Sequence, residues 1–386
     1  MNINEKYIVK IIDEDNIGNG ICKINNFVVF VKNGLLDEKL EIKITNIKKN
    51  YAIGEIIKYI KTSNNRIEVK CKYYDSCGGC NFLHTSYENE RNIKIKYLEK
   101  LFNRKIEYLN TRIINNYRNK VTLHVLNGKL GYYNDNSHEL CVIDDCLLLD
   151  PKINLKINEL NKMNLKDISE IMIRCINNKI MINLTGNIKE FNIDCDSLYI
   201  NNKYIKGDKY LIDEINNYKF SIYPNSFYQV NKEGMTSIYN KALTYIKSDK
   251  SLLDLYCGTG TIGIWMHNKF DNVLGIEINK DSIKNANINK ELNNIKNIEF
   301  KCDDAKNIKK KYDSIIVDPP RNGLSKEVTK YLNDSNSNQI VYISCNPNTL
   351  KRDIELLNKY EIKNLSCCDM FPRTKHIEMI CVLERI

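Results

Sequence analysis

The pattern of apolar and polar positions changes along the chain, and its first part predicts a series of short strands. Runs rich in β-branched and aromatic residues alternate there with turn signals such as Asn33-Gly34. Short strands separated in this way are typical of a small five-stranded barrel, which we predict over residues 1–62. The clearest strand-forming runs are 7–12, 27–31, 40–44 and 52–57.

The middle of the chain, residues 67–216, has a mixed pattern. Apolar positions at helical spacing with alternating charges cover residues 87–101, and we expect the charged face of this helix to be solvated. Strand-like runs follow it, so we predict a central α+β domain. These runs are 121–126, 131–133, 171–176 and 180–184.

From residue 217 to residue 386 the pattern becomes regular, because short apolar strands alternate with helical stretches such as 281–293. This alternation predicts a Rossmann-like, doubly wound α/β sheet. Ligands of such sheets bind at the carboxyl ends of the strands, so residues that directly follow a strand are candidates for chemistry. The predicted strands are 252–255, 273–277, 298–301, 314–318 and 341–344.

The first of these strands leads into a glycine-rich turn. Gly258 and Gly260 would let backbone amides approach a nucleotide-like ligand at the start of a helix. Glu277 ends the next strand, 17 residues after Gly260, where a carboxylate can bind both hydroxyls of a ribose. An NAD-dependent enzyme is the natural alternative. The spacing argues against it, because the third glycine is Gly263 rather than residue 261.

Cys345 follows the last of the predicted parallel strands, in Ile343-Ser-Cys345-Asn-Pro347. A thiol at the carboxyl edge of the sheet could act as a nucleophile. The alternative is a buried cysteine that packs as a small apolar side chain. This strand alone favours the alternative, and only the rest of the chain reverses that preference.

The densest group of cysteines consists of Cys71, Cys77 and Cys80. Two glycines between Cys77 and Cys80 allow a turn tight enough to point both thiolates at one centre. Tetrahedral zinc and iron–sulfur clusters usually take four thiolates, so a fourth cysteine is required. Cys146 is the best candidate and Cys141 competes with it. The spacing leaves zinc and iron–sulfur equally open.

Composition narrows the class of protein. A chain of 386 residues is long enough for two or three domains. Its 58 lysines and arginines against 48 acidic residues give a net charge of +10, which favours a polyanionic partner. We see no apolar signal segment and no membrane span, so we expect a cytoplasmic protein with fourteen reduced cysteines. His84, His124 and His138 show no metal-like grouping, and we interpret each as structural.

The N-terminal stretch combines basic and aromatic residues, as surfaces for single-stranded nucleic acid do. It resembles the TRAM domain, an OB-like β-barrel that binds RNA. One departure is Leu36-Asp37-Glu38, where that family often has Pro-Gly-Glu. An ordinary solvated barrel is the alternative. The basic and aromatic residues are Lys43, Lys48, Lys49, Lys58, Tyr51 and Tyr59.

Nearly the whole chain resembles the S-adenosylmethionine-dependent RNA uracil-5-methyltransferases, in particular their 23S ribosomal RNA branch. Six short motifs in the family's order carry the resemblance. Departures are small: Thr261 stands where some members have Asn, and leucines follow Cys146. The motifs are Cys71-x5-Cys77-x2-Cys80 with Cys146, Phe227-Tyr-Gln229-Val-Asn231, Asp254-x-Tyr-Cys-Gly-x-Gly260, Asp318-Pro-Pro-Arg321, Ser344-Cys345-Asn-Pro347 and His376-Ile-Glu378.

This resemblance implies a methyltransferase sheet over residues 217–386 and two bound groups, an iron–sulfur cluster and S-adenosylmethionine. The cysteine group would hold a 4Fe–4S cluster rather than zinc. S-adenosylmethionine would be bound at the carboxyl edge of the sheet. The residues implied for that pocket are Gln229, Tyr256, Thr261, Glu277, Asp304 and Asp318.

The chemistry explains why such residues would be needed. Carbon 5 of uracil is a weak nucleophile until a thiolate adds to carbon 6, and Cys345 fits that role. Glu378 fits the base that then removes the carbon 5 proton. It lies in residues 375–380, a late strand that could pass beside the Cys345 strand, and an exposed strand carboxylate is the alternative. Phe227 could stack on an extruded uracil, although an aromatic in such a run is more often core.

We therefore expect a cytoplasmic, monomeric RNA uracil-5-methyltransferase that makes 5-methyluridine in 23S ribosomal RNA and has no membrane partner. Transfer RNA is the second substrate class. A cytosine-5-methyltransferase also uses a cysteine nucleophile, but in a different motif context. Outside the enzymes, a non-catalytic RNA-binding iron–sulfur protein is the alternative, and the presence of both Cys345 and Glu378 argues against it.

Overall fold

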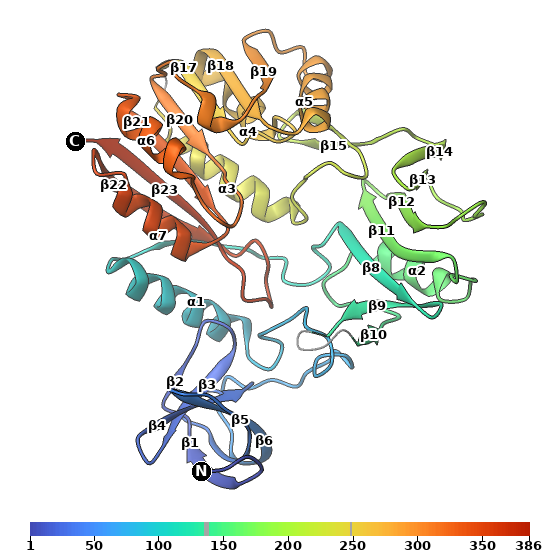
Figure 1. Ribbon diagram of the computed structural model, residues 1–386, viewed down its shortest axis with the longest axis vertical. Helices are drawn as coiled ribbons and strands as arrows, with labels where there is room; N and C mark the ends of the chain where they lie inside the picture. Colours follow the sequence, from blue (N-terminus) through green and yellow to red (C-terminus); the bar gives the residue numbers. More distant parts are fainter. Residues whose placement is uncertain (135–138, 248) are drawn as a thin grey trace. The chain divides into compact units, whose positions relative to one another are not determined.

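The computed structural model describes residues 1–134, 139–247 and 249–386, and Figure 1 colours them by sequence. They form two compact units. Unit 1 consists of Met1–Arg104, Tyr133–Cys141 and Phe371–His376. Unit 2 consists of Lys105–Tyr132, Val142–Met370 and Ile377–Ile386. The region 67–216 is therefore divided between the two units.

The first six strands of unit 1 form one sheet in the order β1-β5-β6-β4-β3-β2. This is one strand more than predicted, because the short strand β2 (Asp13–Glu14) pairs with β3 across the turn at Gly18. Apolar residues alternate in and out, so that Leu40, Ile42 and Ile44 of β5 are buried together. The other strands are β1 (Lys6–Lys10), β3 (Asn19–Ile24), β4 (Phe27–Lys32), β5 (Lys39–Ile47) and β6 (Tyr51–Lys61).

The turn before β5 contains the departure from Pro-Gly-Glu noted in the sequence. Asp37 has a φ of 66°, a left-handed conformation that glycine adopts without strain. Glu38 is fully buried and accepts two hydrogen bonds from the Arg66 guanidinium, at 2.6 and 2.7 Å. Arg66 also lies 4.6 Å from the centre of the Tyr59 ring. The pair of Glu38 and Arg66 therefore holds the segment that follows β6 against the six-stranded sheet.

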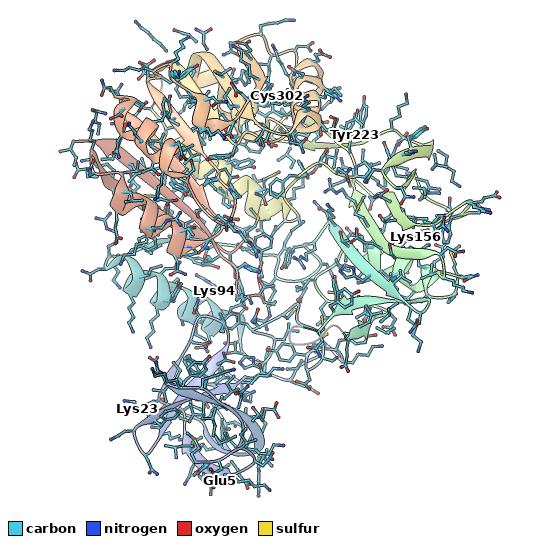
Figure 2. The ribbon with its side chains drawn as sticks, in the orientation of Figure 1. Glu5, Lys23, Lys94, Lys156, Tyr223 and Cys302 are labelled. Carbon is cyan, nitrogen blue, oxygen red and sulfur yellow. The ribbon has the colours of Figure 1, made fainter. Side chains whose placement is uncertain are left out.

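Helix α1 (Tyr87–Phe102) confirms the helix predicted over residues 87–101. The Ser86 hydroxyl accepts the Asn89 N–H at 3.2 Å and caps the amino end. Asn103, with a φ of 50°, ends the helix in the left-handed conformation. Its buried face carries an ion pair of 2.8 Å between Glu90 and Lys94, and Lys94 is labelled in Figure 2.

A second sheet, most of it in unit 2, has seven strands in the order β10-β9-β8-β11-β12-β13-β14, and it confirms the strands predicted between residues 121 and 184. Its central strand β11 is almost entirely apolar and buried, and α2 (Pro151–Leu160) packs against it. The strands in this part of the chain are β8 (Lys120–Leu126), β9 (Lys129–Tyr133), β10 (Leu140–Val142), β11 (Ile168–Ile176), β12 (Lys179–Gly186), β13 (Ser197–Ile200), β14 (Lys203–Gly207), β15 (Leu211–Ile215) and β16 (Tyr218–Ile222).

The larger sheet of unit 2 has eight strands in the order β19-β18-β17-β20-β21-β23-β22-β7 (Figure 1). The five strands β19, β18, β17, β20 and β21 are parallel, as predicted. β23 is antiparallel to both of its neighbours. An antiparallel strand begins where its parallel neighbour ends. The strands are β7 (Glu107–Leu109), β17 (Asp249–Leu255), β18 (Phe270–Glu277), β19 (Ile298–Cys302), β20 (Ser314–Val317), β21 (Gln339–Ser344), β22 (Tyr360–Cys368) and β23 (Glu378–Arg385).

Helices follow the parallel strands and pack on this sheet. All residues of β20 and β21 are buried, as expected for strands covered on both faces. α3 contacts β22 and β23, and α5 contacts β18 and β19. In the described part of the chain, no helix combines the length and apolar character needed to cross a membrane. The helices are α3 (Lys232–Tyr245), α4 (Thr261–Met266), η1 (His267–Lys269), α5 (Lys280–Leu292), η2 (Ala305–Asn307), α6 (Lys326–Asp334) and α7 (Pro347–Leu356).

Candidate active site

The glycine-rich turn after β17 forms one side of the site. Tyr256 adopts a φ of 63°, which is unusual for a bulky residue and is typical of a strained functional position. Gly260 has a φ of 78°, and a Cβ atom there would lie 2.5 Å from the Phe300 ring. Asp254, buried in β17, accepts the Gly263 N–H at 2.9 Å and so fixes the start of α4. The turn therefore keeps a shape that only glycine permits at residue 260.

Glu277 ends β18 beside this turn, as the sequence predicted. One carboxylate oxygen accepts the Asn279 N–H at 2.8 Å, and the other accepts the Gly258 N–H at 3.3 Å. Each oxygen still has a second lone pair for a hydroxyl donor. A ribose bound at Glu277 would therefore lie against the glycine-rich turn.

Two further residues implied for the cofactor pocket lie close to the same turn. Thr261 begins α4, is buried, and its hydroxyl lies 3.2 Å from the Thr259 hydroxyl. Asp304 follows β19, caps η2 and forms an ion pair of 2.9 Å with Lys306. Burial raises the pKa of Tyr256 to about 12, and the charge of Asp304 adds to this shift. Tyr256 and Asp304 are thus electrostatic neighbours.

Cys345 lies directly after β21, and the turn that follows it is well ordered by hydrogen bonds. The Ser344 hydroxyl accepts the Asn346 N–H at 3.2 Å. The Asn346 side chain donates to the carbonyl oxygen of Arg321 at 3.1 Å. The side chain of Arg321 in turn forms a hydrogen bond with the Cys345 thiol. The Asp318-Pro-Pro-Arg321 motif therefore supports the cysteine turn from the neighbouring strand β20.

The register of β21 and β23 places Glu378 beside Cys345. Ser344 pairs with Met379 in this antiparallel ladder, so the next position brings residues 345 and 378 together. Glu378 is the first residue of β23 and is 5% exposed. The prediction that its strand passes beside the Cys345 strand is confirmed, and the exposed-carboxylate alternative is wrong. The strand begins at Glu378, later than the predicted start at residue 375. Lys375 belongs to unit 1.

The carboxylates at this edge are costly to ionise. Burial raises the pKa of Asp254 to about 8 and that of Asp318 to about 7. Burial also raises the pKa of Glu378 well above its ordinary value, and the charge of Asp318 contributes. Within the described residues, Oε2 of Glu378 accepts no hydrogen bond. A buried, unsatisfied carboxylate needs an explanation, and a catalytic role supplies one.

The same charges act on the candidate nucleophile. Burial raises the pKa of Cys345 to about 11, and the charges of Glu378 and Asp318 raise it further. Arg321 opposes this shift through its charge and its hydrogen bond to the thiol. A thiolate at Cys345 is therefore favoured when the carboxylates are protonated and Arg321 is in place.

Tyr239 and its partner Gln229 lie close to the buried carboxylates of the site. Tyr239 of α3 is buried and hydrogen-bonds to Gln229. Burial raises the pKa of Tyr239 well above its ordinary value, and the charges of Asp318 and Asp254 add to the shift. The sequence pointed to neither Tyr239 nor Arg321 as a site residue. Arg321 stood inside a quoted motif, whereas Tyr239 looks like any core aromatic of a helix.

Phe227 is 66% exposed and precedes α3. Its carbonyl oxygen accepts a hydrogen bond of 3.5 Å from the Thr259 hydroxyl, which fixes the backbone near the glycine-rich turn. The alternative that this ring belongs to the core is therefore wrong. An exposed aromatic ring next to the turn is available to stack on a base.

The cysteine loop belongs to unit 1. The Gly79 N–H donates to the Cys77 sulfur at 3.4 Å, a hydrogen bond that suits a thiolate ligand. Cys141 lies against the same loop, with its sulfur 3.3 Å from the Ser76 hydroxyl. Cys146 belongs to unit 2. In residues 1–134, 139–247 and 249–386, no three metal-ligating side chains are already grouped around one point.

Unit 1 also contains a candidate surface for RNA. A pocket of about 650 Å³ opens between the barrel and the cysteine loop. Phe30 and Tyr51 meet in it edge to face, with ring centres 5.4 Å apart, and Tyr51 is 37% exposed. Lys32 and Lys375 also line it. Aromatic rings beside cations are suited to unpaired nucleotides.

Two of the three histidines interpreted as structural are described, His84 in unit 1 and His124 in unit 2. His84 is buried and its ring nitrogen lies 2.8 Å from the Tyr74 hydroxyl. Burial lowers the pKa of His84 to about 3, so its ring stays neutral. His124 lies 3.9 Å from Glu170 on the smaller sheet. His138 falls outside the described residues.

Comparisons with known proteins agree with this geometry. The family described as tRNA (Uracil-5-)-methyltransferase matches residues 34–386, and the TRAM domain matches residues 2–57. An uncharacterized RNA methyltransferase of Clostridium acetobutylicum is 32% identical over 99% of this chain and 98% of its own length. One of Staphylococcus epidermidis is 31% identical with the same coverage. The Pyrococcus abyssi tRNA (uracil-54, C5)-methyltransferase structure, in complex with S-adenosyl-L-homocysteine, has a TM-score of 0.84 at 24% identity, covering 98% of this chain and 100% of that one.

The raised pKa of Asp254 predicts how stability depends on pH. A carboxyl group with a higher pKa in the folded state favours folding at low pH and loses this advantage as the pH rises through the folded-state pKa. For Asp254 the window runs from 3.8 to about 8. Asp254→Asn keeps an acceptor for Gly263, so the free energy of unfolding should fall less steeply across this window, by up to a few kcal/mol. Chemical denaturation of the ligand-free protein at several pH values measures it.

The matched control is Asp304→Asn, which removes an exposed aspartate whose pKa is lowered by its hydrogen bond with Lys306. This variant should leave the fall in stability between pH 3.8 and about 8 in place. Equal pH slopes for Asp254→Asn and the natural protein would show that Asp254 is not a costly buried acid.

Proposed function

Because this chain belongs to the tRNA (uracil-5-)-methyltransferase family, we propose that it methylates carbon 5 of a uridine in RNA through a covalent adduct with Cys345. The chain is an RNA methyltransferase of this family. The observation that carries the mechanism is the register of β21 and β23, which brings Cys345 and Glu378 together at the carboxyl edge of the sheet.

Catalysis begins with the ionisation of Cys345. Its thiolate bonds to carbon 6 of the uracil, and the electron pair of the ring double bond moves to oxygen 4 as an enolate. Arg321 stabilises the thiolate through its charge and hydrogen bond. The thiol proton needs an acceptor other than Glu378, which must take a later proton. Asp318, with a pKa of about 7, is the neighbouring group poised for this role.

Protonation of Asp318 also prepares the base. The negative charge of Asp318 contributes to the raised pKa of Glu378. When Asp318 takes the thiol proton, this charge disappears and Glu378 ionises more readily. Glu378 then releases its own proton to solvent and becomes the base, so the two carboxylates exchange roles during the reaction.

S-adenosylmethionine, when bound, supplies a methyl group on a positively charged sulfonium. Carbon 5 of the adduct takes this methyl group and retains its proton. Glu378 then removes that proton, the ring double bond reforms, and the carbon–sulfur bond to Cys345 breaks. Cys345 leaves as a thiolate and regains its proton from Asp318. Glu378 ends protonated, as it began, so the proton that it released to solvent is the one proton that the reaction produces.

We assign the cofactor pocket to the edge formed by β17, β18, β19 and β20. Glu277 would hold the ribose hydroxyls, beside the close backbone approach at Gly258 and Gly260. Tyr256, in its strained conformation, would support the adenosine side of the ligand. The other residues assigned to this pocket are Gln229, Thr261, Asp304 and Asp318.

We propose that the substrate is structured RNA in the cytoplasm and that the protein acts as a monomer. The N-terminal barrel together with the cysteine loop favours 23S ribosomal RNA. Transfer RNA is the second candidate, because the same fold, over 98% of this chain, occurs in a Pyrococcus abyssi enzyme that acts on uracil 54 of transfer RNA. The proposal of 23S ribosomal RNA therefore rests on the combination of the N-terminal domain with the cysteine loop.

Two surfaces would contact the RNA. Phe227 would stack on the extruded uridine, since its ring is exposed beside the glycine-rich turn. In unit 1, the pocket with Phe30, Tyr51 and Lys32 would bind other, unpaired nucleotides of the RNA. The positive net charge adds a contribution to binding that salt would weaken.

We further propose that Cys71, Cys77, Cys80 and Cys146 hold a 4Fe–4S cluster. The hydrogen bond from Gly79 to the Cys77 sulfur supports a thiolate at that position. Cys141 is the competing fourth ligand, because it lies against the same loop. None of the steps above requires electron transfer, so we propose a structural role for the cluster.

The first prediction concerns the substrate. Cells that lack this protein should lose 5-methyluridine at one or more positions of 23S ribosomal RNA and keep it in transfer RNA. Mapping 5-methyluridine in both RNA classes measures the loss, and a Cys345→Ala copy should not restore it. Loss of 5-methyluridine from transfer RNA alone would identify transfer RNA as the substrate. Full retention in both classes would contradict the proposed activity.

The second prediction separates the catalytic roles. Cys345→Ala should abolish methylation but leave S-adenosylmethionine binding nearly intact, because the assigned cofactor contacts lie on other strands. Glu378→Gln should allow addition and methyl transfer but not elimination, so a protein–RNA adduct carrying the donor's methyl label should accumulate on denaturing gels. 5-Fluorouridine at the target should trap the natural enzyme in the same way.

Both traps should disappear when Cys345→Ala is introduced. A labelled adduct that persists would identify another nucleophile, such as Cys257 or Cys302 (labelled in Figure 2). An unlabelled adduct in Glu378→Gln would place the carboxylate before methyl transfer rather than after it.

The third prediction concerns the cysteine loop. Anaerobically purified protein should be brown and contain about four irons per chain. Cys146→Ser should lose the iron, whereas Cys141→Ser should keep it. The reverse result would identify Cys141 as the fourth ligand. Stoichiometric zinc without iron would rule out the cluster.

A further inference from the structure

Two cations lie directly opposite each other in the seven-stranded sheet, and we call them the cation pair. Lys120 of β8 pairs with Arg174 of β11 in the antiparallel ladder (Figure 1). Residues in this position project from the same face of a sheet, where like charges repel each other. Burial and the charge of Arg174 both lower the pKa of Lys120, to about 8. A neutral side chain at residue 120 would avoid this conflict.

Arg174 is fully buried, and its hydrogen bonds are incomplete. One guanidinium nitrogen donates to the Ser226 carbonyl oxygen at 3.1 Å. Within the described residues, its Nε and Nη1 donate no hydrogen bond. Burial lowers the pKa of Arg174 to about 10, so the guanidinium still carries its charge at neutral pH. A buried charge without a partner is costly, and a missing anion explains it.

The carboxylates around the cation pair have other partners or lie at the surface. Glu170 acts electrostatically on the lysine, but it is 40% exposed and lies 3.9 Å from His124. Tyr228 acts on the arginine, but its hydroxyl donates to Asp213, which also pairs with Lys232 at 2.7 Å. In the part of the chain that the structure describes, no carboxylate forms an ion pair with either member of the cation pair.

The other face of β11 is covered by α2. The thiol of Cys175 hydrogen-bonds with Asp150, which caps the start of that helix. Successive residues of a strand point to opposite faces. Arg174 and Lys120 therefore project from the face that α2 leaves uncovered.

This uncovered face adjoins the backbone that carries Phe227. The guanidinium of the cation pair holds the carbonyl oxygen of Ser226, the residue directly before Phe227. Beside the pair, the Asn119 side chain donates to the Gln229 carbonyl oxygen at 3.2 Å. Because Phe227 would stack on the extruded uridine, an anion bound by the cation pair would lie next to the target nucleotide.

A pocket of about 360 Å³ extends along the same face, and Ser226 lines it. Two of its other lining residues are Tyr199 and Tyr223, and Tyr223 is labelled in Figure 2. Tyr199 pairs with Asn183, and Asn183 pairs with Met172, two positions before the arginine of the cation pair. Tyr199 thus lies on the face of the cation pair. Aromatic rings beside cations are suited to RNA.

We propose that Lys120 and Arg174 form a binding site for one backbone phosphate of the substrate RNA, next to the target uridine. The proposal rests on the function proposed above and deepens it. Lys120, which is half-buried, contacts the phosphate, whereas Arg174 lies deeper, holds Ser226 and adds positive charge. The carboxylate of the methyl donor is the other anion of suitable chemistry, and the test separates the two sources.

The test uses Lys120→Met in the full-length protein, because methionine keeps the length of the side chain and removes the charge. Lys120→Arg keeps the charge. Lys152→Gln is the matched control, since it neutralises an exposed lysine of α2, on the other side of β11. Unmodified transcripts of 23S ribosomal RNA and of transfer RNA are titrated at several salt concentrations, without methyl donor. The transcript that binds more tightly gives the slope of log K against log salt. Calorimetry with S-adenosylmethionine measures donor binding.

For Lys120→Met, the slope should shrink by about one, because one phosphate contact is lost. RNA binding at low salt should weaken about tenfold, and donor binding should stay natural. The Tm of the RNA-free protein should rise, since a repelled, half-buried cation is removed. Lys120→Arg and Lys152→Gln should both keep the natural slope. If Lys120→Met does not fold, Lys120→Gln carries the same comparison.

A natural slope in the folded Lys120 variant would overturn the proposal, and so would an equal change of slope in Lys152→Gln. Weaker donor binding with a natural RNA slope would assign the anion to the donor's carboxylate instead. Methylation of the same transcripts by the natural protein is measured in parallel. A changed slope without any 5-methyluridine would refute the proposed methylation and support the phosphate site, so the two failures are distinguishable.

Discussion

The antiparallel pairing of β21 with β23 is the constraint on which the candidate active site depends. Parallel strands deliver their last residues to one edge of the sheet, but a base opposite Cys345 requires a strand that starts at that edge. β23 meets this condition because it begins at Glu378 between two antiparallel neighbours. All residues of β21 are buried, and a slip of one residue would turn each side chain to the other face. The packing of the core thus fixes the register of the catalytic pair.

The second constraint is electrostatic. Asp254, Asp318 and Glu378 all have raised pKa values, and burial is the largest cause for each. Such an arrangement lowers stability near neutral pH, because the folded protein opposes ionisation that the unfolded chain permits. Arg321 is the cation that acts on both Glu378 and Cys345. The site therefore holds groups that exchange protons near neutral pH, at the expense of stability.

Local patterns in the sequence predicted most of the fold, because the burial of alternating or continuous apolar runs is a local signal. The parallel strands and α1 appear within a few residues of the predicted bounds. The strand that ends before Cys345 made this residue a candidate, and the family resemblance pointed to Glu378. The contacts of Tyr239 and Arg373 could not be predicted in this way, since they join residues far apart in the chain. Neither the two-residue strand β2 nor the exposure of Phe227 leaves a distinctive pattern.

Long-range contacts also determine when unit 1 can be completed. Arg373 and Glu90 are separated by 283 residues, so unit 1 lacks a part of its own interior until the C-terminal end of the chain is in place. Closing so long a loop costs conformational entropy, which the buried ion pair and the backbone hydrogen bonds of residue 373 must offset. β23, by contrast, is held from its first residue within unit 2, where Glu378 pairs with Cys368 and Met379 pairs with Ser344. Unit 1 is therefore completed by residues 371–376, a segment that lies in the sequence between two strands of the larger sheet, β22 and β23.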